Sequence, residues 1–195
     1  MATKKNYEFT RAIFHIGCSL ILVWTLNYVK PTVFASCAFL IILLVELIRL
    51  KNNKINNYLT AHKYFFWHKI IRDEEKNNFT PLFAASLAFL IISWLPLNLL
   101  AIAILINGFA DPAARICGIK WGKKKILNTK NSFVGSFAFF VVAFLVCAAF
   151  SIPILPSFAV AIVGTVAEFV PDKKPLWVDN LRIPVSVGLV LWILV

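Results

Sequence analysis

The chain has 195 residues, of which 60% are hydrophobic, and its mean hydropathy is +0.80. Soluble domains have about 45–50% apolar residues, so this composition excludes an ordinary soluble enzyme and predicts an integral membrane protein. The 20 Lys and Arg residues outnumber the 9 Asp and Glu residues, an excess that basic cytosolic segments of a membrane protein explain better than nucleic-acid binding does.

We expect an all-α, polytopic membrane helix bundle that forms one domain over residues 1–195. A full crossing needs roughly 20 apolar residues, and the chain offers about seven candidate spans. The fourth and seventh candidates are short, and the first lacks the small-residue cleavage site of a signal peptide. The candidate spans cover residues 12–29, 32–49, 80–96, 97–110, 133–150, 154–170 and 183–195.

The charged segments predict the orientation. If the N-terminus is cytosolic and the spans alternate, every Lys and Arg except Lys30 lies on or beside the cytosolic face. This distribution follows the positive-inside rule. We therefore expect any site built by the polar segments to lie on the cytosolic face of a membrane, most simply a prokaryotic plasma membrane.

Two short polar patterns come first along the chain. Arg11 and His15 are four residues apart at the start of the first span, so they share one face of a helix. An Arg at such a place either binds a phosphate or only extends its charge to the interface. Glu46 and Arg49 are three apart near the end of the second span, and we expect an intrahelical ion pair. The aromatic and charged residues at about 51–78 predict a helix lying on the cytosolic surface.

The segment at about 111–136 carries the strongest chemical pattern, and we expect a loop that binds a nucleotide. Asp111 follows an apolar run, where its carboxylate can hold a metal ion. Glycines permit close backbone approach or a positive φ, lysines supply positive charge, and the start of the next helix offers N–H groups to an anion. The alternative is a basic loop with a capping serine. The candidate nucleotide-binding residues here are Gly118, Gly122, Lys125, Lys130, Ser132, Gly135 and Ser136.

A second acidic group lies toward the C-terminus. Glu168 falls late in an apolar run, where an ionisable side chain is costly and marks a candidate functional residue. Asp179 and Asn180 stand just before the last span and can share a metal ion. Capping of the final helix is the structural alternative for this pair.

Taken in order, these pieces resemble the CTP-dependent polyprenol/dolichol kinase and diacylglycerol kinase family, which includes phytol kinases and is related to CDP-diacylglycerol synthases. The likeness covers most of the chain and rests on the ordered set of short patterns. It departs from the family at Ala12, where a Lys is expected, at Asn131, which shifts the Lys-Ser register, and at Pro81. The matching residues are Arg11-x-x-x-His15, Glu46-x-x-Arg49, Arg72-x-x-Glu75, Asp111-x-x-Ala114 with Gly118 and Gly122, Lys130 to Ser136, Glu168 and Asp179-Asn180.

The resemblance implies transfer of the γ-phosphate of CTP to the hydroxyl of a lipid alcohol. Mg²⁺ would be held by Asp111 with Asp179 or Asn180, and the phosphates by Arg11, Lys125 and Lys130 with the Ser132–Ser136 helix start. The proton of the alcohol hydroxyl would go to Asp179, or else to Glu168 or His15. The expected partners are CTP, the lipid alcohol and the bilayer, without nucleic acid. Oligomeric state and the particular alcohol stay open.

Two other functions compete with this hypothesis. In cytidylyl transfer a lipid phosphate attacks the α-phosphorus of CTP and pyrophosphate leaves, and the same residue types would serve. A short chain without the longer synthase signature favours the kinase. The other competitor is a lipid carrier or scaffold without catalysis, which assigns no metal to Asp111.

Overall fold

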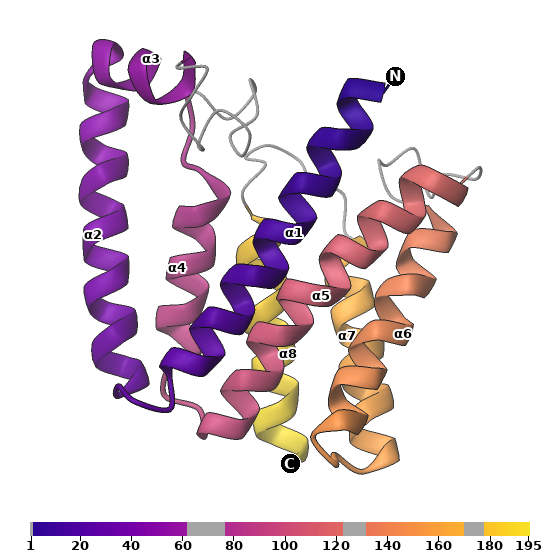
Figure 1. Ribbon diagram of the computed structural model, residues 1–195. Helices are drawn as coiled ribbons and strands as arrows, with labels where there is room; N and C mark the ends of the chain where they lie inside the picture. Colours follow the sequence, from indigo (N-terminus) through magenta and orange to yellow (C-terminus); the bar gives the residue numbers. More distant parts are fainter. Residues whose placement is uncertain (1, 62–76, 123–131, 170–177) are drawn as a thin grey trace.

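A computed structural model describes residues 2–61, 77–122, 132–169 and 178–195, and this part of the chain is all-helical (Figure 1). The expected all-α class is therefore confirmed. The helices are α1 (Ala2–Thr25), α2 (Pro31–Lys51), α3 (Asn53–Ala61), α4 (Pro81–Ile92), α5 (Leu97–Trp121), α6 (Phe133–Ala149), α7 (Ile154–Phe169) and α8 (Asp179–Leu194).

Helix α5 is the centre of the bundle. It packs against α1, α6 and α8, while α7 joins α6 to α8, and α4 joins α8 to α2. The core follows from this order: α5 contributes Leu100, Ile102 and Ile106, and α8 contributes Val187 and Leu191, all fully buried. Helix α2 lies at the outer edge and packs chiefly on α4 (Figure 1).

Successive long helices run in opposite directions, which brings the elements of interest to one end of the bundle (Figure 1). The end of α2, all of α3 and the start of α4 lie there, together with the end of α5, the start of α6, the end of α7 and the start of α8. The short connections after α1, α4 and α6 lie at the opposite end. The start of α1 lies at the first of these ends as well (Figure 1).

The structure corrects the expected boundaries around α4 and α5. The span expected at 80–96 is a helix of 12 residues, whereas the span expected to be short, 97–110, is the beginning of a helix of 25 residues. A loop was expected from residue 111 because a polar segment follows the apolar run there, but α5 continues through Pro112 to Trp121. A helix tolerates one such proline when tertiary packing compensates for the missing N–H bond, and α5 is packed on three sides.

Two helices of the described residues, α2 and α5, are long and apolar enough to cross a bilayer. Only 17% of the most apolar window of α2 is buried, against 61% for α5. Leu40, Ile41 and Leu44 are each more than half exposed on α2. An apolar helix with this much exposed surface needs an apolar surrounding, which agrees with membrane association.

The crossing of α5 and α6 depends on the lack of a side chain at Gly135. A Cβ atom placed there would lie 2.7 Å from the carbonyl oxygen of Ala114 on α5. The hydroxyl of Ser132, the N-cap of α6, accepts a hydrogen bond from the Gly135 N–H at 3.1 Å. The cap and the glycine together fix where α6 starts against α5.

We predict that Gly135→Ala destabilises the protein by about 1–3 kcal/mol, because the added methyl forces the two helices apart. The measurement is thermal unfolding in detergent. Gly17→Ala on α1 is the matched control, since a Cβ there meets nothing within 4 Å and Ala favours a helix by roughly 1 kcal/mol over Gly. Equal melting temperatures for the two variants would contradict the close crossing.

Candidate functional site

A recess between α1 and α5 brings together the two parts of the sequence that were expected to act on phosphate. Arg11, Ala12 and His15 line it from α1, and Asp111, Pro112 and Arg115 line it from α5. The expectation that Arg11 and His15 share a helix face is confirmed. The recess is narrow, with a cavity volume of about 10 Å³, roughly enough for one water molecule and far below the roughly 300–1,000 Å³ of a pocket for a whole small molecule. A phosphate group with a cation would therefore need the lining side chains to move apart.

Close contact of α1 with α5 forms this recess. Gly108, on α5, lies against the Ser19 side chain and the His15 backbone, so any Cβ at position 108 would collide with Ser19. Ser19 is buried, and its hydroxyl donates to the carbonyl of Ile16 at 2.9 Å. The contact one turn deeper in the bundle therefore holds Arg11 and His15 beside Asp111.

The charges in the recess suit an anion with a metal ion. Arg11 is 4% exposed, and a charge so buried is retained only where other charges or polar groups compensate for it. Asp111 and Arg115 form an ion pair across 3.8 Å, one helical turn apart. This distance exceeds the roughly 2.7–2.9 Å of a charge-assisted hydrogen bond. The Asp111 carboxylate thus keeps capacity to ligate a cation.

A second carboxylate, that of Glu168, lies within electrostatic range of the first. The Ser136 hydroxyl donates to Glu168 across the α6–α7 interface at 3.1 Å. The charges of Asp111, Arg115 and Arg182 act on Glu168, so four helices contribute to one charged group. Arg182 also donates from Nε to the carbonyl of Ala167 at 2.7 Å, which satisfies an acceptor in the last turn of α7.

The other predicted site residues divide into two groups. Gly118, Gly122 and Gly135 surround the Ser132 side chain, so these predicted nucleotide residues are gathered at the α5–α6 crossing. The glycines there provide close approach, and no glycine of the described residues has a positive φ. Lys125 and Lys130 lie outside the described residues, as does most of the segment expected as an interfacial helix at 51–78 beyond α3.

The C-terminal pair is placed only in part. Helix α8 begins at Asp179, with Val178 at the N-cap, so Asn180 lies inside the first turn rather than at the cap. Asn180 is buried in the first turn of α8. It does not line the recess between α1 and α5, and the Asp179 side chain lies outside the described part of the structure.

The residues fit Mg²⁺ bound together with a phosphate. Within the described residues, no three or more His, Cys, Asp or Glu side chains gather as a complete metal cage. Mg²⁺ does not need one, because it usually binds one or two carboxylates and takes its other ligands from substrate phosphates and water. Asp111, the carboxylate among the residues lining the recess, could serve as the protein ligand in that mode.

Sequence reasoning missed Arg115, Arg182 and Asn107 as residues of this region. Arg115 is four residues after Asp111, but that spacing has meaning only in a helix, and the segment was expected to be a loop. Arg182 follows Asp179 by three and was overlooked beside the acidic pair. Asn107 was read as part of an apolar run, although a polar residue within a span was the available signal.

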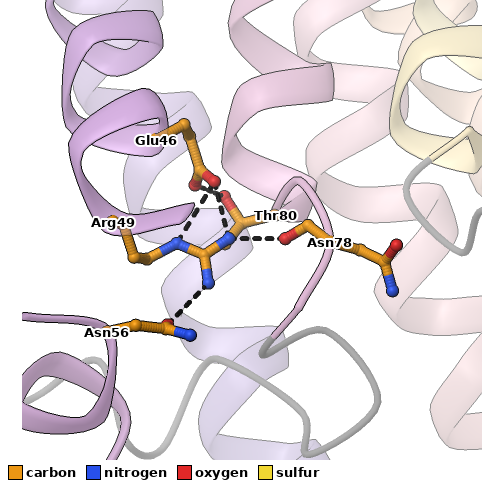
Figure 2. Close-up of polar contacts among 5 residues, drawn as sticks. All are labelled: Glu46, Arg49, Asn56, Asn78 and Thr80. Carbon is orange, nitrogen blue, oxygen red and sulfur yellow. Dashed lines mark hydrogen bonds and ion pairs between the residues drawn. The ribbon is translucent and has the colours of Figure 1, made fainter. Parts of the chain in front are cut away.

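A separate polar cluster, formed by Glu46, Arg49, Asn56, Asn78 and Thr80, joins α2 to α3 and α4 (Figure 2). The ion pair expected between Glu46 and Arg49 is confirmed, with Arg49 Nη2 2.7 Å from Glu46 Oε2. Arg49 also donates to Asn56 Oδ1 at 3.0 Å and to the carbonyl of Asn78, and the Thr80 hydroxyl donates to Glu46. Because the pair is buried and richly bonded, this cluster is structural.

Comparison of the chain with protein-family models, with curated proteins and with solved structures finds no match.

We predict that Arg49→Met destabilises the protein by about 3–5 kcal/mol, because Glu46 is left as a buried charge without its cation. The double variant Glu46→Leu/Arg49→Met should lose clearly less stability, since neither buried charge then remains. Thermal and denaturant unfolding in detergent measure both. If the double variant lost as much stability as Arg49→Met and Glu46→Leu lose together, the pair itself would contribute nothing.

Proposed function

We propose that the chain is a membrane enzyme with about seven spans that transfers the γ-phosphate of CTP to the hydroxyl of a lipid alcohol. The supporting observation is the recess in which Arg11 and His15 of α1 meet Asp111 and Arg115 of α5. Two arginines beside a carboxylate suit a phosphate that carries a metal ion, because the arginines attract the phosphate and the carboxylate attracts the metal. The resemblance to the lipid-kinase family supplies CTP and the alcohol.

The proposal assigns a cytosolic location to the end of the bundle that holds the recess. The N-terminus would be cytosolic, and the exposed apolar faces of α1, α2 and α7 would contact lipid. Lys30 lies exposed in the turn at the opposite end. The nucleotide would approach from the aqueous side, while the alcohol would enter from the bilayer with its tail left among apolar side chains.

Phosphoryl transfer of this kind depends on positioning and on neutralising charge. Arg11 and Arg115 would neutralise phosphate oxygens, and Asp111 would hold Mg²⁺, which when bound polarises the transferred phosphoryl group. Ser136 orients Glu168 within reach of the same charges. The acceptor's proton would pass to a base, for which Asp179, Glu168 and His15 are the candidates.

The decisive experiment uses purified protein in detergent, Mg²⁺ and a panel of long-chain alcohols, diacylglycerol and phosphatidate. One arm contains CTP labelled at the γ-phosphate and the other CTP labelled at the α-phosphate. We expect γ-label in the lipid, and its loss by a factor of about 10³ or more in Asp111→Asn. Transfer of α-label would instead identify a cytidylyltransferase, and no transfer by folded protein would favour a carrier.

We also predict that Arg11→Gln and Arg115→Gln each raise the KM for CTP roughly ten- to a hundredfold, because each removes a charged hydrogen-bond donor to phosphate. Lys30→Gln is the charge-matched control and should leave the KM unchanged. Steady-state kinetics over a CTP series check this. An equal effect of all three variants would point to net charge rather than to the recess.

A further inference from the structure

Asn107 has an acceptor oxygen that the fold leaves unused. Its Oδ1 atom is buried, and no donor within the described residues reaches it. Buried polar atoms of native proteins are nearly always hydrogen-bonded, and leaving one unpaired costs stability. An orphaned oxygen inside an apolar helix bundle therefore indicates a position where a ligand donates.

A second acceptor lies next to it in the chain. Residue i+4 normally donates its N–H to the carbonyl of residue i in a helix, but residue 112 is proline and has no N–H to give to Gly108. The Gly108 carbonyl points along α5 toward Pro112, and Pro112 lines the recess. Two neighbouring oxygens, on Asn107 and Gly108, thus lack their ordinary donors in the turn of α5 that precedes Asp111 and Pro112.

The position relative to Asp111 is equally specific. Asn107 and Asp111 are four residues apart in α5, so they lie on one face of the helix with side chains about 5–6 Å apart. Asn107 precedes Asp111 by one turn, on the side of α5 that leads back into the apolar first half of this helix. A group held by Asn107 would sit between the carboxylate and the apolar part of the bundle.

The geometry points to Asn107, with the Gly108 carbonyl, as the site that receives the hydroxyl group of a neutral lipid alcohol and holds it beside Asp111. This inference rests on the proposed function and names the residue that selects the acceptor. Both oxygens accept hydrogen bonds, so they favour an O–H donor and disfavour the anionic oxygens of a lipid phosphate. A lipid ether of the same length offers no donor and should also be rejected.

The first test measures binding and needs no turnover. A long-chain alcohol carrying a photoactivatable diazirine in its tail is crosslinked to the purified protein, with competition by the unlabelled alcohol or by its methyl ether. We expect the alcohol to compete roughly ten- to a hundredfold better than the ether in wild type, and this preference to vanish in Asn107→Leu. Equal competition by alcohol and ether in wild type would overturn the inference.

Asn98→Leu is the matched control, because Asn98 is exposed near the start of the same helix and its loss should leave the preference intact. Asn107→Leu should melt at the same temperature as wild type or higher, since an apolar side chain replaces an unpaired oxygen. A lower melting temperature combined with an intact preference for alcohol would mean that Asn107 is only structural.

The kinetic arm separates this inference from the proposed function. If wild type transfers γ-label, Asn107→Leu should raise the KM for the alcohol roughly ten- to a hundredfold and change the KM for CTP by less than about twofold. A rise in the KM for CTP alone would overturn the assignment. If wild type transfers no label but still prefers alcohol to ether through Asn107, the kinase proposal fails and the alcohol site stands.

Discussion

The close approach of α5 to α1 and α6 is the constraint on which the rest of the structure depends. At Gly108 the backbone of α5 lies against Ser19 of α1, and at Gly135 the backbone of α6 lies against Ala114 of α5. Inside a membrane, helices gain little from hiding apolar side chains from lipid, so packing between small residues decides which helices associate. These two contacts determine which side chains of α1, α5 and α6 can meet.

The polar groups divide into two clusters with different degrees of hydrogen bonding. Arg49 donates to Glu46 within α2, to Asn56 of α3 and to the carbonyl of Asn78 just before α4, so the cluster fixes the outer helix α2 to α3 and α4 (Figure 2). Around Asp111 the ion pair is wide and the oxygen of Asn107 lacks a donor among the described residues. A buried cluster whose polar groups are hydrogen-bonded to one another stabilises the fold, whereas an acceptor without a donor inside a bundle is suited to a ligand.

Much of the secondary structure could be predicted from the sequence because apolar runs and helix-start signals are local. Pro31 and Pro81 occupy the first turns of α2 and α4, and Ser132 caps α6. The spacing of Glu46 and Arg49 predicted their ion pair for the same reason. The extent of α5 could not be predicted, because Pro112 is a local stop signal that packing on three sides overrides. With α5 shortened to 110, Arg115 had no helical relation to Asp111.

The sequence by itself determined the all-helical class, the alternation of apolar and charged segments and the identity of most charged candidates, since all of these depend on residue type and short spacing. Only the tertiary structure decided which of them meet. It joined Arg11 to Asp111 across about a hundred positions of sequence, and it placed Gly118 and Gly122 at a helix crossing. It also left Asn107 with an unused oxygen. Contacts between distant helices depend on the fit of their surfaces, which no local pattern encodes.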